Sequence, residues 1–497
     1  MTTDALATRV PPRLRPDPAR VIAELFVPGH ALGGEGEGRA SVVVEHILGL
    51  TDEQVTSSLA SITERFGGRH RDLGGIFRRH AERIANRLEP SNELSDERLE
   101  LLGATFTHEY AVEAAALCNP SVVASPDQRG VPAGSLRFVM STRQIGEGHR
   151  SGIGFRRGTF DGNGGVTIEA PGPLTTAGTV RTATLETSAF RRGIRADDAE
   201  ATGWVLDRLG GLFTVADLEA RLSELEAQYD TRRNIAATVR RLRALAARSY
   251  DVVFDPDSEL GSRVLSPATS VESNGLEDAR FVRFVDDSGA ATHYATYTAF
   301  DGVDICLQLL ATADFVTFSS TPLLGAAATN KGLALFPRQI DGRFVALSRH
   351  DGARNAIAQS DDLRCWPRAE PLDCPTETWA TVQVGNCGSP IETGEGWLVL
   401  THGVGPMRTY SIGALLLDLD DPTRVIRRTK QPLLTPQPDE QNGYVPNVVY
   451  SCGALLHGAT LLLPYGIGDA NIGFATIDLG ELLTSMDDAS VGVATPL

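Results

Sequence analysis

A pair of short β-strand patterns that recurs five times constrains the fold of this chain more than any other feature. In each unit an apolar, alternating strand precedes a second strand, and Gly, Asp or Pro separates the two. The units begin near residues 135–140, 279–284, 342–347, 396–400 and 459–464. From Phe281 to Leu461 they are spaced by roughly 55 to 65 residues, close to the length of one propeller blade with its loops. The pattern predicts an all-β five-bladed β-propeller, and the alternative is a pair of all-β sandwiches.

Two regions break this rhythm with helical periodicity. Apolar residues recur at helical spacing between residues 52 and 116, where Ser95 precedes an acidic first turn, and again between 197 and 248. We therefore expect a helical N-terminal extension (1–116), a first blade region (117–196), a helical insertion (197–250) and the remaining blades (251–497). The helices would cover a blade edge or form a subunit interface of a homo-oligomer.

Composition excludes several classes of protein. The net charge of −17 argues against a nucleic-acid partner. There is no apolar run of about 18 residues that would predict a membrane span. The N-terminus lacks an apolar stretch before Pro11, so no secretion signal is expected and the cytoplasm is the expected location. The six cysteines form no CxxC pair, which favours reduced thiols.

One segment combines groups suited to proton transfer. Glu277, Asp278 and Arg280 come directly before an alternating strand, and a carboxyl group beside a cation can be tuned as an acid or a base. A structural salt bridge between Asp278 and Arg280 is the alternative.

Polar side chains also follow the strands of the other units. Asn, Asp, His, Tyr and Arg side chains suit a substrate with many hydroxyl groups, so carbohydrate is the expected substrate class. The histidines are too dispersed to predict a metal site, and no HExxH motif, phosphate-binding glycine loop or nucleophile elbow is present. These polar residues are His149, Arg150, Asn330, Lys331, Arg349, His350, Asn386, His402, Tyr410 and Asp469.

Five ordered motifs resemble a known family. They lie at residues 277–280, 330–337, 396–403, 412–420 and 443–449. Between about Asn119 and Asp478 the chain resembles the inverting β-mannoside phosphorylases and β-mannosidases of glycoside hydrolase family 130. That resemblance implies a five-bladed propeller, in agreement with the repeat count.

The resemblance also implies roles for individual residues. Asp278 matches the sole protein general acid, which acts through a hydroxyl of the bound mannose. Asn119, Arg137 and Asp469 match residues that hold the mannosyl unit. Lys331, Arg349, His402 and Tyr410 match residues that bind inorganic phosphate, whereas Gln383 stands where the phosphorylases carry a lysine. No organic cofactor or metal is implied, and phosphate is a co-substrate.

The expected function is cleavage of a β-mannoside, such as a manno-oligosaccharide, with inversion. Phosphorolysis to mannose 1-phosphate is favoured over hydrolysis. A hydrolase would need a second carboxylate about 6.5 to 9.5 Å from the acid, and the candidates for that base are Glu272, Glu277 and Glu377. A carbohydrate-binding propeller without catalysis is a third alternative. The linkage and the leaving-group sugar stay open.

Overall fold

The computed structural model describes residues 6–28, 36–85, 94–192, 199–228, 235–372 and 377–489. The chain divides into two compact units. The larger unit comprises residues 1–16, 115–171 and 178–497, and the smaller comprises 17–114 and 172–177.

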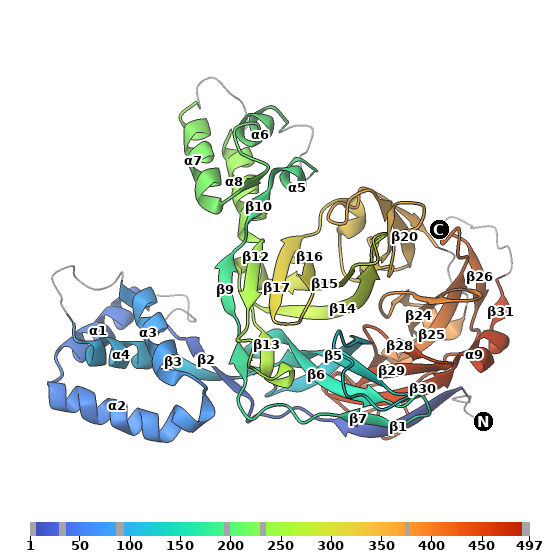
Figure 1. Cartoon of the computed structure of the whole chain (residues 1–497), viewed down its shortest axis with the longest axis horizontal. Helices are drawn as coiled ribbons and strands as arrows, with labels where there is room; N and C mark the ends of the chain where they lie inside the picture. Colours follow the sequence, from blue (N-terminus) through green and yellow to red (C-terminus); the bar gives the residue numbers. More distant parts are fainter. Residues whose placement is uncertain are drawn as a thin grey trace. The chain divides into compact units, whose positions relative to one another are not determined.

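The larger unit is rich in β-sheet (Figure 1). Its strands can be divided into five groups in chain order, of which the first two belong to one twelve-stranded sheet, joined by a single parallel pairing of Ser151 with Gly275. The first group is β4 (Ala116–Ala124), β5 (Leu136–Ile145), β6 (Ser151–Phe160) and β7 (Val166–Ile168), all antiparallel. The second is β14 (Gly275–Val285), β15 (Ala291–Phe300), β16 (Ile305–Thr312) and β17 (Thr317–Pro322). Strands β12 (Tyr250–Val253) and β9 (Thr179–Thr182) extend the second group, and β13 (Arg263–Leu265) pairs with β6.

The third to fifth groups follow in chain order. The third is β18 (Ala334–Leu335), β19 (Phe344–Ser348), β20 (Ala356–Ser360) and β21 (Ala369–Pro371). The fourth is β22 (Gln383–Asn386), β24 (Gly396–Val404), β25 (Tyr410–Leu417) and β26 (Val425–Arg428), with β23 (Ile391–Thr393) and β31 (Asp487–Asp488) at its margins. The fifth is β27 (Val449–Tyr450), β29 (Thr460–Ile467), β30 (Asn471–Asp478) and β28 (Leu455–His457), followed by α9 (Leu479–Ser485).

Buried apolar residues fill the space between neighbouring groups. Leu398 and Leu416 of the fourth group share a core cluster with Leu461 and Leu463 of the fifth. Phe155 of the first group packs with Phe281 of the second, with ring centroids 6.1 Å apart. These contacts explain the near-continuous apolar runs in the strands, since burial on both faces of a sheet removes the polar alternation.

A strand from the N-terminus completes the fifth group. β1 (Ala7–Leu14) pairs antiparallel with β30, with Ala7 opposite Ile477. The guanidinium of Arg9 donates a hydrogen bond of 2.9 Å to Glu440, a fully buried carboxylate. The expected helical extension of residues 1–116 is therefore wrong at its start, because residues 7–14 belong to a sheet of the larger unit.

Four helices form a separate cluster in the larger unit. They are α5 (Thr187–Arg192), α6 (Ala199–Leu206), α7 (Val215–Glu226) and α8 (Ile235–Ala247), with a small hairpin of β10 (Leu185–Glu186) and β11 (Leu212–Phe213). Thr214 and Asp217 form a capping box at the start of α7. Leu218, Leu222 and Val239 lie in the shared apolar core. The helical segment thus begins about ten residues before the predicted boundary at 197.

The smaller unit contains β2 (Val21–Leu25) paired with β3 (Thr107–Ala111), the short strand β8 (Thr176–Ala177), and four helices. The helices are α1 (Gly36–Leu48), α2 (Asp52–Phe66), α3 (Leu73–Ile84) and α4 (Asp96–Thr105). The Ser95 hydroxyl accepts a hydrogen bond from the Arg98 amide and so caps α4, as its sequence pattern predicted. Helix α1 precedes residues 52–116, the range in which the apolar spacing predicts helices.

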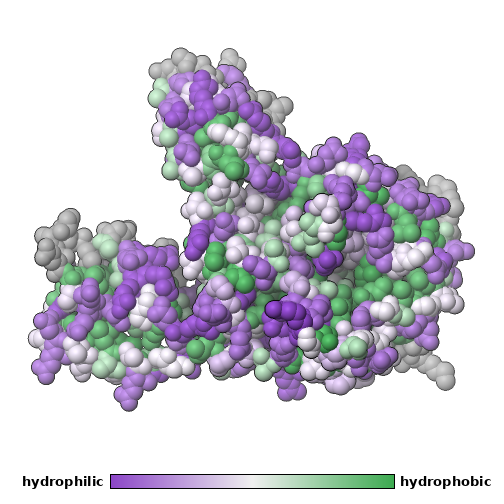
Figure 2. All heavy atoms as spheres, in the orientation of Figure 1, coloured by the Kyte–Doolittle hydropathy of each residue, from purple (hydrophilic) through white to green (hydrophobic). Residues whose placement is uncertain are grey.

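None of the helices within the described residues is long and apolar enough to cross a membrane. On the face of the molecule shown in Figure 2, hydrophilic and hydrophobic residues lie interspersed.

Candidate active site

Two β-bulges position the side chains of Asn119 and Asp278, two polar residues of the candidate active site. The β4–β5 register shifts between Cys118 and Ser121, and the β14–β15 register shifts between Glu277 and Arg280. Within these bulges Asn119 (φ 47°) and Asp278 (φ 54°) adopt the left-handed conformation. Such a bulge turns a side chain out of the regular alternation of the strand, at a cost on the order of 1–3 kcal/mol for a non-glycine residue.

The side chains of Asn119 and Asp278 contact each other. The Asn119 amide donates a hydrogen bond of 2.5 Å to Asp278 Oδ1. Arg143 of β5 contacts the same carboxylate, with Nη1 3.7 Å from Oδ1. Arg280 donates instead to the carbonyl oxygen of Asp278 (2.9 Å) and to the Tyr450 hydroxyl (2.8 Å). The contacts of Arg280 thus fix the backbone of the bulge and leave the Asp278 carboxylate to Asn119 and Arg143.

Asp278 lies in a cavity of about 370 Å³. All five strand groups contribute to its lining, which contains Asn119, Arg143, Asp278, Asn330, Lys331, Arg349, Gly352, Gln383, His402, Arg408, Tyr410, Val445, Val448, Tyr450 and Asp469. The structure therefore brings together every site residue predicted from the sequence except Arg137.

Cationic and polar groups from the third and fourth strand groups line one part of this cavity. Lys331 follows β17 and donates to Glu277 Oε2 at 2.5 Å. Arg349 follows β19 and is buried. His402 of β24 and Tyr410 of β25 stack with ring centroids 6.1 Å apart. A Cβ atom at Gly385 would lie 2.5 Å from both Arg349 Nε and His402 Cε1, so a glycine is needed for their close approach.

Several buried polar atoms of the site have no hydrogen-bond partner among the described residues. In the residues that line the cavity they are Asn119 Oδ1, Arg143 Nε, Arg349 Nε and His402 Nε2. Unpaired buried polar atoms cost about 1–3 kcal/mol each, so their concentration in one place indicates a ligand that satisfies them.

His402 is held as a neutral ring. Burial, together with Arg349 and Arg280, lowers the pKa of His402 well below its ordinary value. Its Nδ1 lies 3.2 Å from the Asn386 carbonyl oxygen. Because a carbonyl only accepts, Nδ1 carries the proton and Nε2 is a hydrogen-bond acceptor. A ligand at Nε2 must therefore donate, as the P–OH group of hydrogen phosphate or a sugar hydroxyl does.

The two carboxyl groups of the cavity differ in acidity. Burial alone would raise the pKa of Asp278, but Arg143, Arg280 and Lys331 together hold that pKa below its usual range. Burial and the neighbouring charge of Asp278 raise the pKa of Asp469 to about 6. Asp278 is thus ionised well below neutral pH, whereas Asp469 loses its proton only near pH 6.

Arg137, predicted to hold the mannosyl unit, is not among the residues that line this cavity. Its guanidinium donates to the carbonyl oxygens of Asp127 and Arg129. Arg143, six residues further along β5, occupies the site in its place; six residues of strand span roughly 20 Å. Both arginines lie on the same face of β5, so alternation alone could not distinguish them.

The candidate bases of a hydrolase lie outside the cavity lining. Glu272 is buried and accepts hydrogen bonds from the Tyr250 and Tyr297 hydroxyls, at 2.9 and 2.6 Å. Glu277 is paired with Lys331 and, at 2.6 Å, with Arg143. Among the described residues of the lining, Asp278 and Asp469 are the carboxylates, and Glu377 is not among them.

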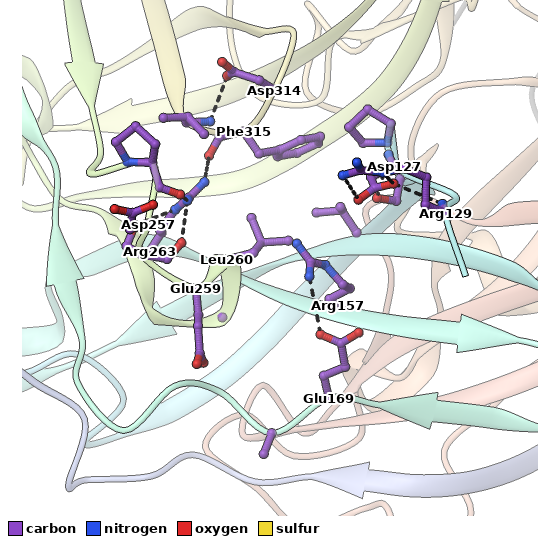
Figure 3. A pocket seen from close by; sticks show the side chains of 18 residues that line it. Asp127, Arg129, Arg157, Glu169, Asp257, Glu259, Leu260, Arg263, Asp314 and Phe315 are labelled. Carbon is purple, nitrogen blue, oxygen red and sulfur yellow. Dashed lines mark hydrogen bonds and ion pairs between the residues drawn. The ribbon is translucent and has the colours of Figure 1, made fainter. Parts of the chain in front are cut away.

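A larger cavity, of about 740 Å³, shares no lining residue with this site. Figure 3 shows hydrogen bonds and ion pairs of Arg263, of Arg157 with Glu169 and of Asp127 with Arg129. The buried Arg263 donates to the Phe315 carbonyl oxygen at 2.7 Å, and Arg157 lies 3.7 Å from Glu169. These contacts support a structural role for the charged residues there.

The described residues contain no cluster of three or more His, Cys, Asp or Glu side chains suited to hold a metal ion.

Comparison with known proteins agrees with the resemblance found in the sequence. The model of glycoside hydrolase family 130, described as beta-1,4-mannooligosaccharide phosphorylase, matches residues 247–488. A 1,2-beta-oligomannan phosphorylase of Thermoanaerobacter sp. (strain X514) is 37% identical over 230 residues, which cover 45% of this chain and 75% of that protein. The chain belongs to glycoside hydrolase family 130. Asn119 and Arg143 precede the region matched by the family model, and only the fold brings them to Asp278.

Other members of the family are also similar to this chain. A beta-1,2-mannobiose phosphorylase of Listeria innocua is 34% identical over 230 residues, covering 45% of this chain and 63% of that protein. The solved structure of a Listeria innocua beta-1,2-mannobiose phosphorylase with bound beta-1,2-mannobiose superposes with a TM-score of 0.44 at 22% identity, over 80% of this chain and 95% of that one.

Proposed function

We propose that this protein is an inverting β-mannoside phosphorylase that releases α-mannose 1-phosphate. We also infer that its five strand groups are the blades of a five-bladed propeller with the candidate cavity on its axis. Support comes from the cavity lining, to which all five groups contribute. Two packed sandwiches would not bring loops of five successive groups to one cavity.

The observation that carries the proposal is that Asp278 shares one cavity with Lys331, Arg349 and His402. Positive charge and a hydrogen-bond acceptor at His402 Nε2 suit hydrogen phosphate, whose oxygens need donors and whose P–OH needs an acceptor. In the reaction a phosphate oxygen attacks C1 of the mannosyl unit as the bond from C1 to the glycosidic oxygen breaks. The leaving oxygen takes a proton that Asp278 supplies through a mannose hydroxyl.

The protonation state of Asp278 depends on the nearby cations Arg143, Arg280 and Lys331, the last of which is also a proposed phosphate ligand. Without an anion, the cations favour the ionised carboxylate. A phosphate dianion beside them would offset their charge and raise the pKa of Asp278, because a like charge nearby favours the neutral acid. Phosphate binding would thus promote the protonated form that the reaction requires.

Hydrolysis is the competing reaction. Gln383, which lines the cavity, supplies an amide where the phosphorylases carry a lysine and so provides one cation fewer. The carboxylates considered as a base are paired with other groups or absent from the cavity lining, which supports phosphate rather than activated water as the nucleophile. The two relatives described above act on β-1,2-linked substrates, so β-1,2-mannobiose is the preferred first substrate.

The test is incubation of the full chain with β-1,2- and β-1,4-mannobiose, with and without inorganic phosphate. We expect mannose 1-phosphate, detected by ³¹P NMR, only when phosphate is present. Release of two mannose molecules at a rate independent of phosphate would identify a hydrolase. Binding of mannobiose without turnover would identify a carbohydrate-binding propeller.

A phosphorylase draws on inorganic phosphate and yields a charged sugar phosphate, which agrees with the predicted cytoplasmic location. Assembly of a homo-oligomer through the helices likewise stays a prediction, which sedimentation of the purified protein would test.

A further inference from the structure

Two hairpin loops from different strand groups have the same backbone conformation. Residues 146–150 join β5 to β6, and residues 405–409 join β24 to β25 (Figure 1). Gly146 (φ −107°, ψ −156°) corresponds to Gly405 (φ −112°, ψ −162°). A hydrogen bond of 3.0 Å from the amide of the first loop residue to the carbonyl oxygen of the fifth closes each loop.

In both loops the third and fourth residues are left-handed. In the first loop Gly148 (φ 66°) precedes His149 (φ 61°), and in the second Met407 (φ 59°) precedes Arg408 (φ 54°). Three of these four residues have a Cβ atom, and this conformation costs each of them on the order of 1–3 kcal/mol. Backbone strain of this kind concentrates at ligand sites, and here it positions the side chains of His149 and Arg408.

Arg408 lines the cavity of the candidate active site. It is exposed, and no described residue forms a hydrogen bond or ion pair with it. The positive charge of Arg408 lowers the pKa of Asp469, although burial and the charge of Asp278 raise that pKa by more. Arg408 therefore offers its guanidinium donors near the mannosyl-binding side of the cavity, to a group that enters from solvent.

His149, the fourth residue of the loop 146–150, packs against the aromatic ring of Tyr444. The rings of His149 and Tyr444 stack at 19°, with centroids 5.3 Å apart. The Tyr444 hydroxyl and His149 Nδ1 are 2.7 Å apart, within hydrogen-bond distance. Tyr444 is nevertheless 52% exposed, and the next residue, Val445, lines the cavity. An exposed ring that is stacked on His149 and is next in sequence to a lining residue can pack against the apolar face of a pyranose.

We propose that Arg408 and the Tyr444–His149 pair form the subsite for the leaving-group sugar. This inference depends on the proposed function and deepens it, since it assigns a neutral pyranose, such as the second mannose of mannobiose, to that subsite. Arg408 donates to its hydroxyls, and Tyr444 packs against its ring. Both residues would act on the leaving sugar and not on the mannosyl unit or phosphate.

The reverse reaction separates the two substrates. The full chain is given mannose 1-phosphate and mannose, and release of phosphate is measured. We expect Arg408→Ala and Tyr444→Ala to raise the KM for mannose about tenfold or more, while the KM for mannose 1-phosphate changes less than about twofold. Met407→Ala is the matched control, since Met407 is 86% exposed in the same loop and does not line the cavity.

Three results would overturn the inference: an unchanged KM for mannose in both variants, an equal rise in both KM values, or a preference of the wild-type protein for mannose 6-phosphate over mannose. If the wild-type protein releases no phosphate, the proposed function fails, and calorimetric binding then tests the subsite. Weaker binding of mannobiose with unchanged binding of mannose in the two variants would support it. Equal losses for both sugars would exclude it.

Discussion

Lys331 and Glu277 form an ion pair in which Nζ lies 2.5 Å from Oε2. The other carboxylate oxygen of Glu277 accepts a hydrogen bond of 2.6 Å from Arg143. Glu277, which directly precedes the proposed acid Asp278, thus contacts two cations. One is Lys331, a proposed phosphate ligand, and the other is Arg143, which lies beside the Asp278 carboxylate. Glu277 is buried, so both contacts lie where water screens charge weakly.

Replacing Glu277 by Gln should destabilise the protein, because it leaves Lys331 without its anion and leaves Arg143 with Asp278 alone. We expect a loss of about 2–4 kcal/mol, since breaking a buried ion pair costs several kcal/mol and the partial exposure of Lys331 reduces the loss. Thermal unfolding measures it. Glu392→Gln is the control, because its ion pair with Arg338 is 2.7 Å long but more than 40% exposed on both sides, and its loss should change stability by less than about 1 kcal/mol. Equal effects of the two substitutions would contradict this account.

Replacing Asp278 by Asn removes the proposed proton donor and keeps the shape of the side chain. Turnover should fall by about 10²- to 10⁴-fold, the usual contribution of a positioned acid. Calorimetry should still detect mannobiose, because the groups that would hold the sugar remain. A variant with wild-type turnover would eliminate Asp278 as the acid.

Replacing Gly385 by Ala should impair phosphate binding. The added Cβ would lie 2.5 Å from atoms of both Arg349 and His402, so these side chains must move apart. We expect the KM for phosphate to rise about tenfold or more, equivalent to about 1.4 kcal/mol. Gly394→Ala in the same strand group is the control, since its Cβ would meet nothing within 4 Å. A similar KM in both variants would show that the two side chains do not bind phosphate.

Asp469 should make the stability of the protein depend on pH. Its pKa rises from 3.8 to about 6 on folding, so the folded state holds a proton that the unfolded state has lost between these values. Stability therefore falls as pH rises from 3.8 to 6, by about 2–3 kcal/mol in total. Asp469→Asn carries no charge to bury.

The Asn variant should thus be more stable than the wild-type protein at pH 7.5 by up to this amount, and equally stable near pH 4. Unfolding at both pH values measures the difference. A gain of the same size at pH 4 and pH 7.5 would mean that it does not come from the ionisation of Asp469.

Local patterns identified residues that the fold gathers in one cavity where a single motif contains both a strand and the loop that follows it. Asp278, Lys331, Arg349, His402 and Tyr410 lie in or close to such motifs, and all five line one cavity. Asn119 and Asp469 lie there too, although the sequence alone could equally have made them turn residues.

Contacts between distant segments cannot be predicted from local patterns in the chain. β1 pairs with β30 across more than 450 residues, and nothing in the short N-terminal pattern indicates its partner. Arg137 and Arg143 lie on the same face of β5, and the pairing of Arg143 with Cys118 in β4 sets which of them lies beside Asn119. One local feature does favour Arg143 over Arg137. Arg143 lies near the end of β5 that the loop beginning at Gly146 follows, whereas Arg137 lies near the start of the strand.

The sequence by itself determined the kinds of element and the chemical groups, because strand alternation, helical spacing and motif residues are local properties of the chain. Strand register and the two bulges are consequences of packing between segments that are remote in sequence. Only the tertiary structure could therefore decide that Arg143 rather than Arg137 lies beside Asp278, that Glu277 holds Lys331, and that two equivalent loops present His149 and Arg408.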